Sequence, residues 1–164
     1  MKATTVLAGG LAGATAVTLI HESLKAVVPQ APQMDRLGMQ AISKGLRKAG
    51  LDVPQQKTLF TAALVGDLLS NAIYYSMAGL GSEKNIWWRS SVLGLAAGVG
   101  AVLLPEPLGL NKRYSNRSLS TQLMTIGLYV AGAMVTTGII RLMQQKKQKS
   151  HREWERRLVT SAMG

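Results

Sequence analysis

Residues 58–82 read TLFTAALVGDLLSNAIYYSMAGLGS, and the single charged residue among them is Asp67, near the middle. Three further stretches, 3–20, 90–105 and 118–140, contain no Asp, Glu, Lys or Arg. Stretches of this length and polarity match the hydrocarbon core of a bilayer, which a helix crosses with about 20 apolar residues. A carboxylate at such depth is costly and marks a candidate functional site. The sequence therefore predicts a membrane protein with one ionisable group in the middle of an apolar segment.

The overall composition conceals this pattern. A mean hydropathy of +0.13 is ordinary for a soluble protein, but all 19 Lys and Arg residues fall outside the four apolar stretches. Many of the 17 glycines lie inside them. An interior glycine costs a soluble helix about 1 kcal/mol relative to alanine, whereas membrane helices use glycine to approach one another closely. A soluble bundle with Gly-rich buried helices is the alternative.

The hydropathy pattern predicts an all-α, polytopic membrane protein built as a four-helix bundle. The four expected transmembrane helices are 3–28, 57–81, 86–104 and 119–143, within a membrane domain of residues 1–143. The first is expected to be a retained helix and not a cleaved signal peptide, because glycines interrupt its apolar run. Residues 144–164 form a basic, cytoplasmic-type tail.

A shorter amphipathic helix is expected at 33–49, between the first two spans. Its apolar residues recur at three- and four-residue spacing, and its basic residues lie largely on the opposite side. This pattern predicts a helix lying in the membrane interface. A surface helix packed on the protein's own loops is the alternative.

The first and third spans share a glycine motif. Residues 8–19 align without gaps on residues 93–104, and both contain G-x-x-x-G, at Gly9 and Gly13 and at Gly94 and Gly98. The chain would then consist of two repeated helix hairpins, although the second and fourth spans align poorly. The motifs predict close helix packing, within the protomer or, as the alternative, between protomers of a homo-oligomer.

The net charge of +11 suggests an anionic partner. Because the basic residues flank apolar segments and do not alternate with stacking aromatics, we expect anionic lipid headgroups and not nucleic acid. Trp87, Trp88 and Arg89 form an aromatic and basic anchor typical of the headgroup level.

The expected location is a bacterial inner (cytoplasmic) membrane, crossed several times. Four spans divide the basic residues ten to nine between the two sides, so the positive-inside rule scarcely determines an orientation. The dense charge of the tail favours cytoplasmic termini. Insertion in both orientations, as an antiparallel dimer, stays open.

Polar residues gather around Asp67 at helical spacing. Helices one and two are expected to run antiparallel, which brings Asp67 to the depth of the end of the first helix. The predicted intramembrane polar cluster comprises Thr18, His21, Glu22, Asp67, Ser70, Asn71 and Tyr74. This cluster is interpreted either as a relay for protons or cations or, as the favoured hypothesis, as a structural cluster that holds the two helices together.

Most catalytic classes find no support in the sequence. The chain has no cysteine and only two histidines, which is too few for the helical di-metal sites, and it contains no phosphate loop, dinucleotide fingerprint or hydrolase triad. No cofactor or metal is expected, and no family is recognised. The leading hypothesis is an accessory or scaffold membrane protein without catalytic activity, which contacts lipid or a membrane-protein partner. The alternatives are a small proton or ion channel or transporter that uses Asp67, His21 and Glu22, and a lipid-modifying enzyme.

Overall fold

The computed structural model describes residues 1–162, apart from the side chains at positions 150, 151, 155 and 157–162. This part of the chain is helical and contains no strand, which confirms the all-α class. The helices are α1 (Ala3–Val27), α2 (Met34–Lys48), α3 (Gln56–Ser76), α4 (Ile86–Leu103) and α5 (Leu119–Ala162), and the short 3₁₀ turns are η1 (Met77–Gly79), η2 (Glu83–Asn85) and η3 (Lys112–Tyr114).

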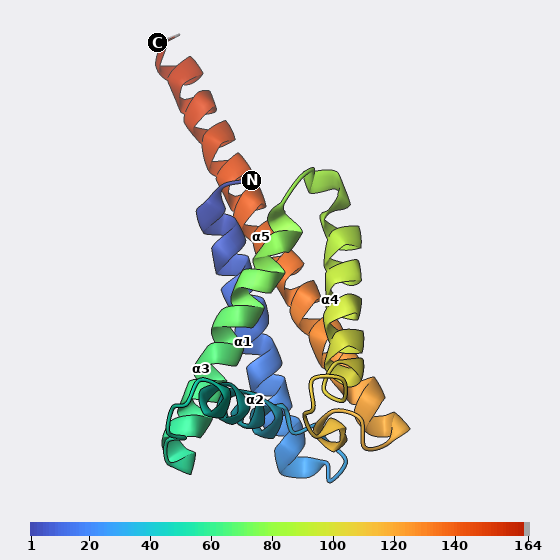
Figure 1. Cartoon of the computed structure of the whole chain (residues 1–164). Helices are drawn as coiled ribbons and strands as arrows, with labels where there is room; N and C mark the ends of the chain where they lie inside the picture. The colour runs from blue at the N-terminus through green and yellow to red at the C-terminus, as the bar shows by residue number, and fades with distance from the viewer. Residues whose placement is uncertain (163–164) are drawn as a thin grey trace.

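The four longer helices run alternately up and down the molecule, and α2 crosses one end of them (Figure 1). The helix α1 packs along both α3 and α5, and α4 packs along α5. In contrast, α3 and α4 scarcely meet. The two helix hairpins are therefore joined through α1 and α5.

Within the described residues, three segments are long and apolar enough to cross a membrane: Ala3–Val27, Glu83–Leu103 and Leu119–Trp154. The predicted second span is not one of them, because its polar residues lower the mean hydropathy of α3. That helix also ends at Ser76, short of the expected residue 81, and a turn through η1 and Gly81 follows. Gly81 has φ +93°, a conformation that other residues adopt only with strain.

All four glycines of the G-x-x-x-G motifs lie against α5. Gly9 and Gly13 of α1 face Thr136, whereas Gly94 and Gly98 of α4 face Ala133 and Ile126. A methyl group added at Gly98 would lie 2.7 Å from the Ile126 Cα, so a side chain there has no room. Both motifs thus pack within the chain, and each holds a helix directly against the backbone of α5.

Tyr75 fills the centre of the interface between α1, α3 and α5. Its side chain is 1% exposed and packs on Ala14, Val17 and Ala133. Its hydroxyl donates a hydrogen bond of 3.0 Å to the carbonyl oxygen of Tyr129 in α5. A large aromatic ring can be buried here because its one polar atom has a partner.

The buried hydroxyl groups of α5 are satisfied locally. Thr125 and Thr136 each donate to the carbonyl oxygen four residues earlier, at 2.8 and 2.9 Å. Thr137 shares a hydrogen bond with Ser90 of α4. These hydroxyls need no functional explanation, since the helix backbone or a neighbouring helix accepts their protons.

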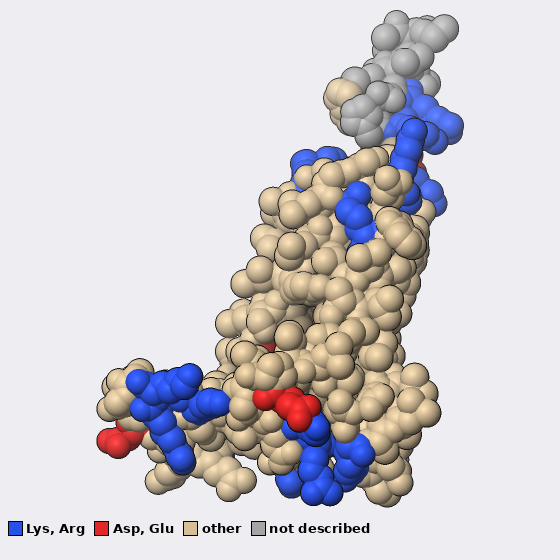
Figure 2. All heavy atoms as spheres, turned by 45° about the vertical axis from the view of Figure 1, so that its right-hand side comes forward, with Lys and Arg blue, Asp and Glu red and all other residues tan. Residues whose placement is uncertain are grey.

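The outer surface of the four long helices is apolar between two charged ends. On the face that Figure 2 shows, basic side chains lie at both ends of the molecule, and a wide band without Lys or Arg separates them. Large apolar side chains exposed on the long helices include Leu11, Leu19, Leu69, Ile73, Leu95 and Leu123. Contiguous exposed apolar surface on this scale is typical of contact with lipid or with another protein.

The helix α5 extends far beyond the other helices. Its 44 residues correspond to about 66 Å at 1.5 Å per residue, and its C-terminal part projects past the start of α1 (Figure 1). The helix continues without a break across the expected boundary between residues 143 and 144. Residues 163 and 164 of the predicted tail lie outside the described residues.

We expect Gly98→Val to separate α4 from α5 and destabilise the protein by about 1–3 kcal/mol, the usual range for overpacking. Gly127→Val is the matched control, because a Cβ at Gly127 meets nothing within 4 Å. Unfolding of the purified protein in dodecyl maltoside by added dodecyl sulfate, followed by circular dichroism, measures the difference. Equal stability of the two variants would contradict the role of this contact.

Candidate functional site

A cavity of about 260 Å³ lies where α1, α2 and α3 meet, and α5 closes its inner side. One part of its wall is polar and is formed by Thr18, His21, Glu22, Asp35, Asp67 and Ser70. The other part is apolar and includes Val17, Ile42, Leu64 and Leu128. The cavity is partly enclosed, with charged and apolar surfaces facing one space.

The structure brings five of the seven residues of the predicted polar cluster to this cavity and leaves two outside it. Thr18, His21, Glu22, Asp67 and Ser70 line the cavity. The other two residues lie further along α3. Asn71 is buried, and its amide nitrogen has no hydrogen-bond partner in the described part of the chain. Tyr74 donates a hydrogen bond of 3.0 Å to the carbonyl oxygen of Leu93 and thus ties α3 to α4.

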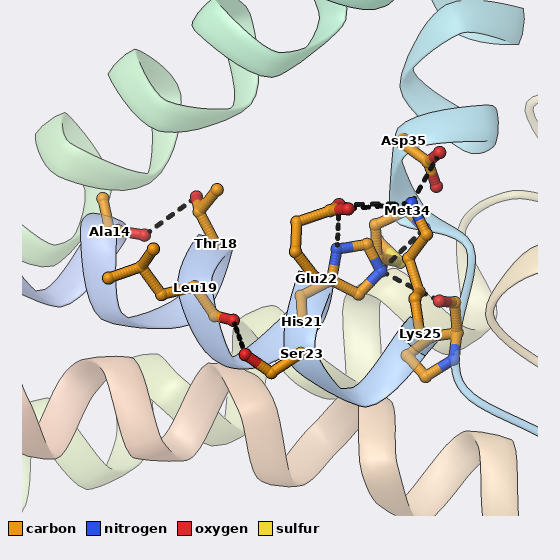
Figure 3. Close-up of polar contacts among 10 residues, drawn as sticks. Ala14, Thr18, Leu19, His21, Glu22, Ser23, Lys25, Met34 and Asp35 are labelled. Atoms are coloured by element: carbon orange, nitrogen blue, oxygen red, sulfur yellow. Dashed lines mark hydrogen bonds and ion pairs between the residues drawn. The ribbon is translucent and has the colours of Figure 1, made fainter. Parts of the chain in front are cut away.

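His21 holds the turn that leads from α1 to α2. The buried imidazole places Nε2 2.9 Å from the carbonyl oxygen of Pro32 and 3.4 Å from the backbone nitrogen of Met34. The shorter distance favours Nε2–H as a donor to Pro32. Nδ1 lies 3.4 Å from Oε1 of Glu22 (Figure 3). His21 therefore has a structural role at the wall of the cavity.

Lys25 joins α1 to α2 through two carboxylates. Its Nζ lies 3.2 Å from both carboxylate oxygens of Glu22 and 2.9 Å from Oδ2 of Asp35 (Figure 3). Burial by itself raises the pKa of Asp35, but the hydrogen bond and charge of Lys25 outweigh it and hold this pKa below the ordinary value of 3.8. The other oxygen of Asp35 is buried without a partner in the described residues.

Asp35 was absent from the predicted cluster. The available signal is an acidic residue in the first turn of an amphipathic helix, shortly after a helix whose last turn contains Lys25. Such a signal is weak, because acidic residues are common in the first turn of any helix. Only the fold of the turn shows that the two side chains meet.

The helix α2 packs along α3 and is also held by polar contacts to the loop between α4 and α5. The backbone nitrogen of Gln33 donates to the Tyr114 carbonyl at 2.7 Å, and Lys44 donates to the Leu108 carbonyl at 2.6 Å. Leu37 is the one fully buried residue of α2, while Arg47 on its other face is exposed. With so little apolar burial, α2 is held less firmly than the other helices.

Asp67 is half-buried at the cavity and has no basic partner. No Lys or Arg in the described part of the chain forms an ion pair with it. Three carboxylates, those of Glu22, Asp35 and Asp67, thus line a wall at which Lys25 is the one paired ammonium group. The cavity carries an excess of negative charge whenever all three are ionised.

The predicted interface anchor lies at the opposite end of the molecule, at the start of α4. Trp87 and Trp88 are exposed. The guanidinium group of Arg89 donates two hydrogen bonds, of 3.1 and 3.0 Å, to the carbonyl oxygen of Ala78. Arg89 thereby closes the turn between α3 and α4, a role beyond that of a surface anchor.

Within the described residues, no group of three His, Asp or Glu side chains is arranged to hold a metal ion. Comparisons with protein families, with curated proteins and with solved structures found no match to this chain.

The pKa of Asp35 determines when the ion pair with Lys25 contributes to the docking of α2. A lowered pKa means that this contribution is fully present above about pH 3.8 and is lost as the pH falls through the pKa of the folded protein. We expect one narrow distance distribution between spin labels at Gly45→Cys and Thr61→Cys from pH 7 to 5, and a broader one below pH 3.8.

Asp35→Asn should broaden the same distribution already at pH 7, because it removes the charge that pairs with Lys25. Asp52→Asn serves as the control, since Asp52 is exposed in the loop before α3. Double electron–electron resonance measures the distance distributions of both variants. The absence of cysteine from the native sequence allows both labels to be placed without background, and a narrow distribution in Asp35→Asn would exclude this ion pair as a tether.

Proposed function

We propose that this chain is an integral, multi-pass membrane protein without catalytic activity, which acts as an accessory or scaffold protein in a bacterial inner membrane. It would hold anionic lipid at both ends and offer the basic extension of α5 to a partner. The observation that carries this proposal is the set of exposed apolar side chains on the long helices, between two basic ends (Figure 2). Basic residues beside an apolar segment are attracted to anionic headgroups.

We include α3 as the fourth transmembrane helix of this proposal. Its 21 residues correspond to about 31 Å, close to the thickness of the hydrocarbon core. It runs antiparallel beside α1 (Figure 1). Leu69 and Ile73 are exposed on its outer side, whereas Asp67 lines the internal cavity. This distribution suits a helix that faces lipid on one side only.

The length of α5 supports a scaffold with a projecting arm. About 66 Å of helix is roughly twice the thickness of the hydrocarbon core, so half of it must lie outside. That half contains Lys146, Lys147, Lys149 and Arg152. A stiff basic helix of this kind suits the acidic surface of a membrane-protein partner or an anionic bilayer surface.

Transport past Asp67 is the second candidate, favoured by the partly enclosed cavity at this residue. Beyond the cavity, however, the path toward the start of α1 is filled by buried side chains, among them Ala14, Tyr75 and Thr136. A conduction route needs ionisable or hydrated groups on both sides of the site. The close packing on one side supports the scaffold proposal over transport.

We expect enrichment of anionic lipid around the protein in mixed nanodiscs of phosphatidylglycerol and phosphatidylcholine. Replacing the exposed residues Arg36, Arg47 and Lys48 of α2 together by Gln should weaken this enrichment by about 1 kcal/mol per charge, and added salt should weaken it further. Spin-labelled lipids of each class measure the preference, with the wild-type protein in phosphatidylcholine alone as the reference. An unchanged preference in the triple variant would contradict headgroup binding by α2.

Proteoliposomes that contain the protein and a pH-sensitive dye should show no proton uptake above that of empty vesicles when a potassium diffusion potential is applied. Asp67→Asn should behave in the same way. Proton flux in the wild type that disappears in a folded Asp67→Asn variant would instead establish the transport alternative.

A further inference from the structure

We propose that the cavity beneath α2 is a binding site for a monovalent organic cation that carries an apolar group. The cationic group would lie near Asp67, and the apolar group would lie along Leu64 and Leu128. This inference is independent of the scaffold function, since it concerns the interior of the protein and not its charged ends.

The negative charge of the cavity wall favours a cationic ligand. Lys25 compensates part of the charge of Glu22 and Asp35, with which it forms ion pairs. Asp67 forms no ion pair with a Lys or Arg of the described residues, and a buried oxygen of Asp35 has no hydrogen-bond partner there. An ionised carboxylate in a partly enclosed site is stabilised by a counter-ion. A ligand of positive charge can supply it.

The volume of the cavity and the apolar part of its wall favour an organic cation over a metal ion. A cavity of about 260 Å³ has the volume of roughly nine liquid waters, which is far more than a bare metal ion needs. Alkali and divalent ions require a nearly complete shell of oxygen ligands, whereas Val17, Ile42 and Leu64 provide none. An alkylammonium ion is weakly hydrated and gains from apolar contact.

Tyr129 adds an aromatic ring to the same wall. The face of such a ring attracts ammonium ions, and cages of this type are a common solution for quaternary ammonium groups. The wall therefore combines three complementary elements: a carboxylate, an aromatic ring and aliphatic side chains.

The helix α2 covers the cavity from outside through Met34, Asp35 and Ile42. Because α2 buries little apolar surface and is held by polar contacts, its displacement is the least costly way to admit a ligand. Gly66 on α3 also borders the cavity, and a Cβ at this position would meet nothing within 4 Å. There is thus unfilled space beside Asp67.

Two kinds of ligand in a membrane environment carry an ammonium group. One is a soluble organic cation, and the other is the headgroup of phosphatidylethanolamine. Benzyltrimethylammonium is a suitable probe for the site, because it joins a quaternary ammonium group to a single apolar ring. Benzenesulfonate has a similar ring and the opposite charge.

The test is isothermal titration calorimetry of the full chain in dodecyl maltoside, an uncharged detergent. Benzyltrimethylammonium should bind at one site per chain, and benzenesulfonate should not bind. Asp67→Asn should weaken binding at least tenfold. Asp52→Asn, which removes an exposed carboxylate from the same end of the molecule, should keep the affinity within twofold.

If Asp67→Asn does not fold, a second pair of variants tests whether the probe binds in the cavity. Gly66→Leu should fill the cavity and weaken binding at least tenfold, while circular dichroism shows an unchanged helix content. Gly138→Leu is its control, because a Cβ at Gly138 in α5 also meets open space and Gly138 does not line the cavity. Gly138→Leu should keep the affinity for benzyltrimethylammonium within twofold.

The source of the ligand follows from competition by short-chain lipids. Displacement of the probe by dihexanoyl phosphatidylethanolamine, but not by dihexanoyl phosphatidylglycerol, assigns the site to a lipid headgroup, and displacement by neither assigns it to a soluble cation. The proposal is overturned if the wild type does not bind the probe, if benzenesulfonate binds equally well, or if both cavity variants bind like their controls.

Discussion

Two helices of this protein lie directly on the backbone of α5, and this close approach determines where the remaining elements can go. Because Gly13 and Gly98 have no side chains, α1 and α4 both reach α5 at distances that no larger residue allows. In a membrane, helices gain little from burying apolar surface against one another, so close packing of small residues is the main attraction available. Once α1 is held in this way, α3 packs along its other side and the short turn after α1 brings α2 across the end. The cavity is a consequence of this order, since α2 bridges α1 and α3 without filling the space below.

Buried hydroxyl groups have hydrogen-bond partners in one half of the molecule, whereas charged groups line a cavity in the other half. In the half near the start of α1, buried hydroxyls have partners in their own or a neighbouring helix, as with Thr136 and Tyr75. In the half near α2, charged groups face one another across a space, and the three carboxylates exceed the available cations. Satisfied polar groups stabilise a unique packing, whereas an uncompensated charge is costly and is retained where it has a use. This asymmetry locates the candidate site at one end and disfavours a route through the whole protein.

The helix α2 has one side on the cavity and the other side exposed. Its inner side closes the cavity, and its outer side carries exposed basic residues such as Arg47 that suit anionic headgroups. The ion pair between Lys25 and Asp35 holds the start of α2 in place at neutral pH, since the pKa of Asp35 is lowered. The same helix thus covers the proposed ligand site and carries the basic residues of the proposed lipid contact. The longer helices, which are locked by glycine contacts and buried side chains, are not required to move.

The sequence by itself determined the all-α class, the starts of the helices to within one residue, and the apolar character of three of them. These features are local: they follow from the spacing of apolar residues and from the position of glycines, prolines and charges along the chain. It also marked Asp67, because one carboxylate in an apolar stretch is visible without any fold. Only the tertiary structure decided that both glycine motifs pack on α5, that Asn71 and Tyr74 lie outside the cavity, and that Asp35 belongs to it. Those facts depend on which faces meet across the turn after α1, and contacts between residues distant along the chain have no signature in the local pattern.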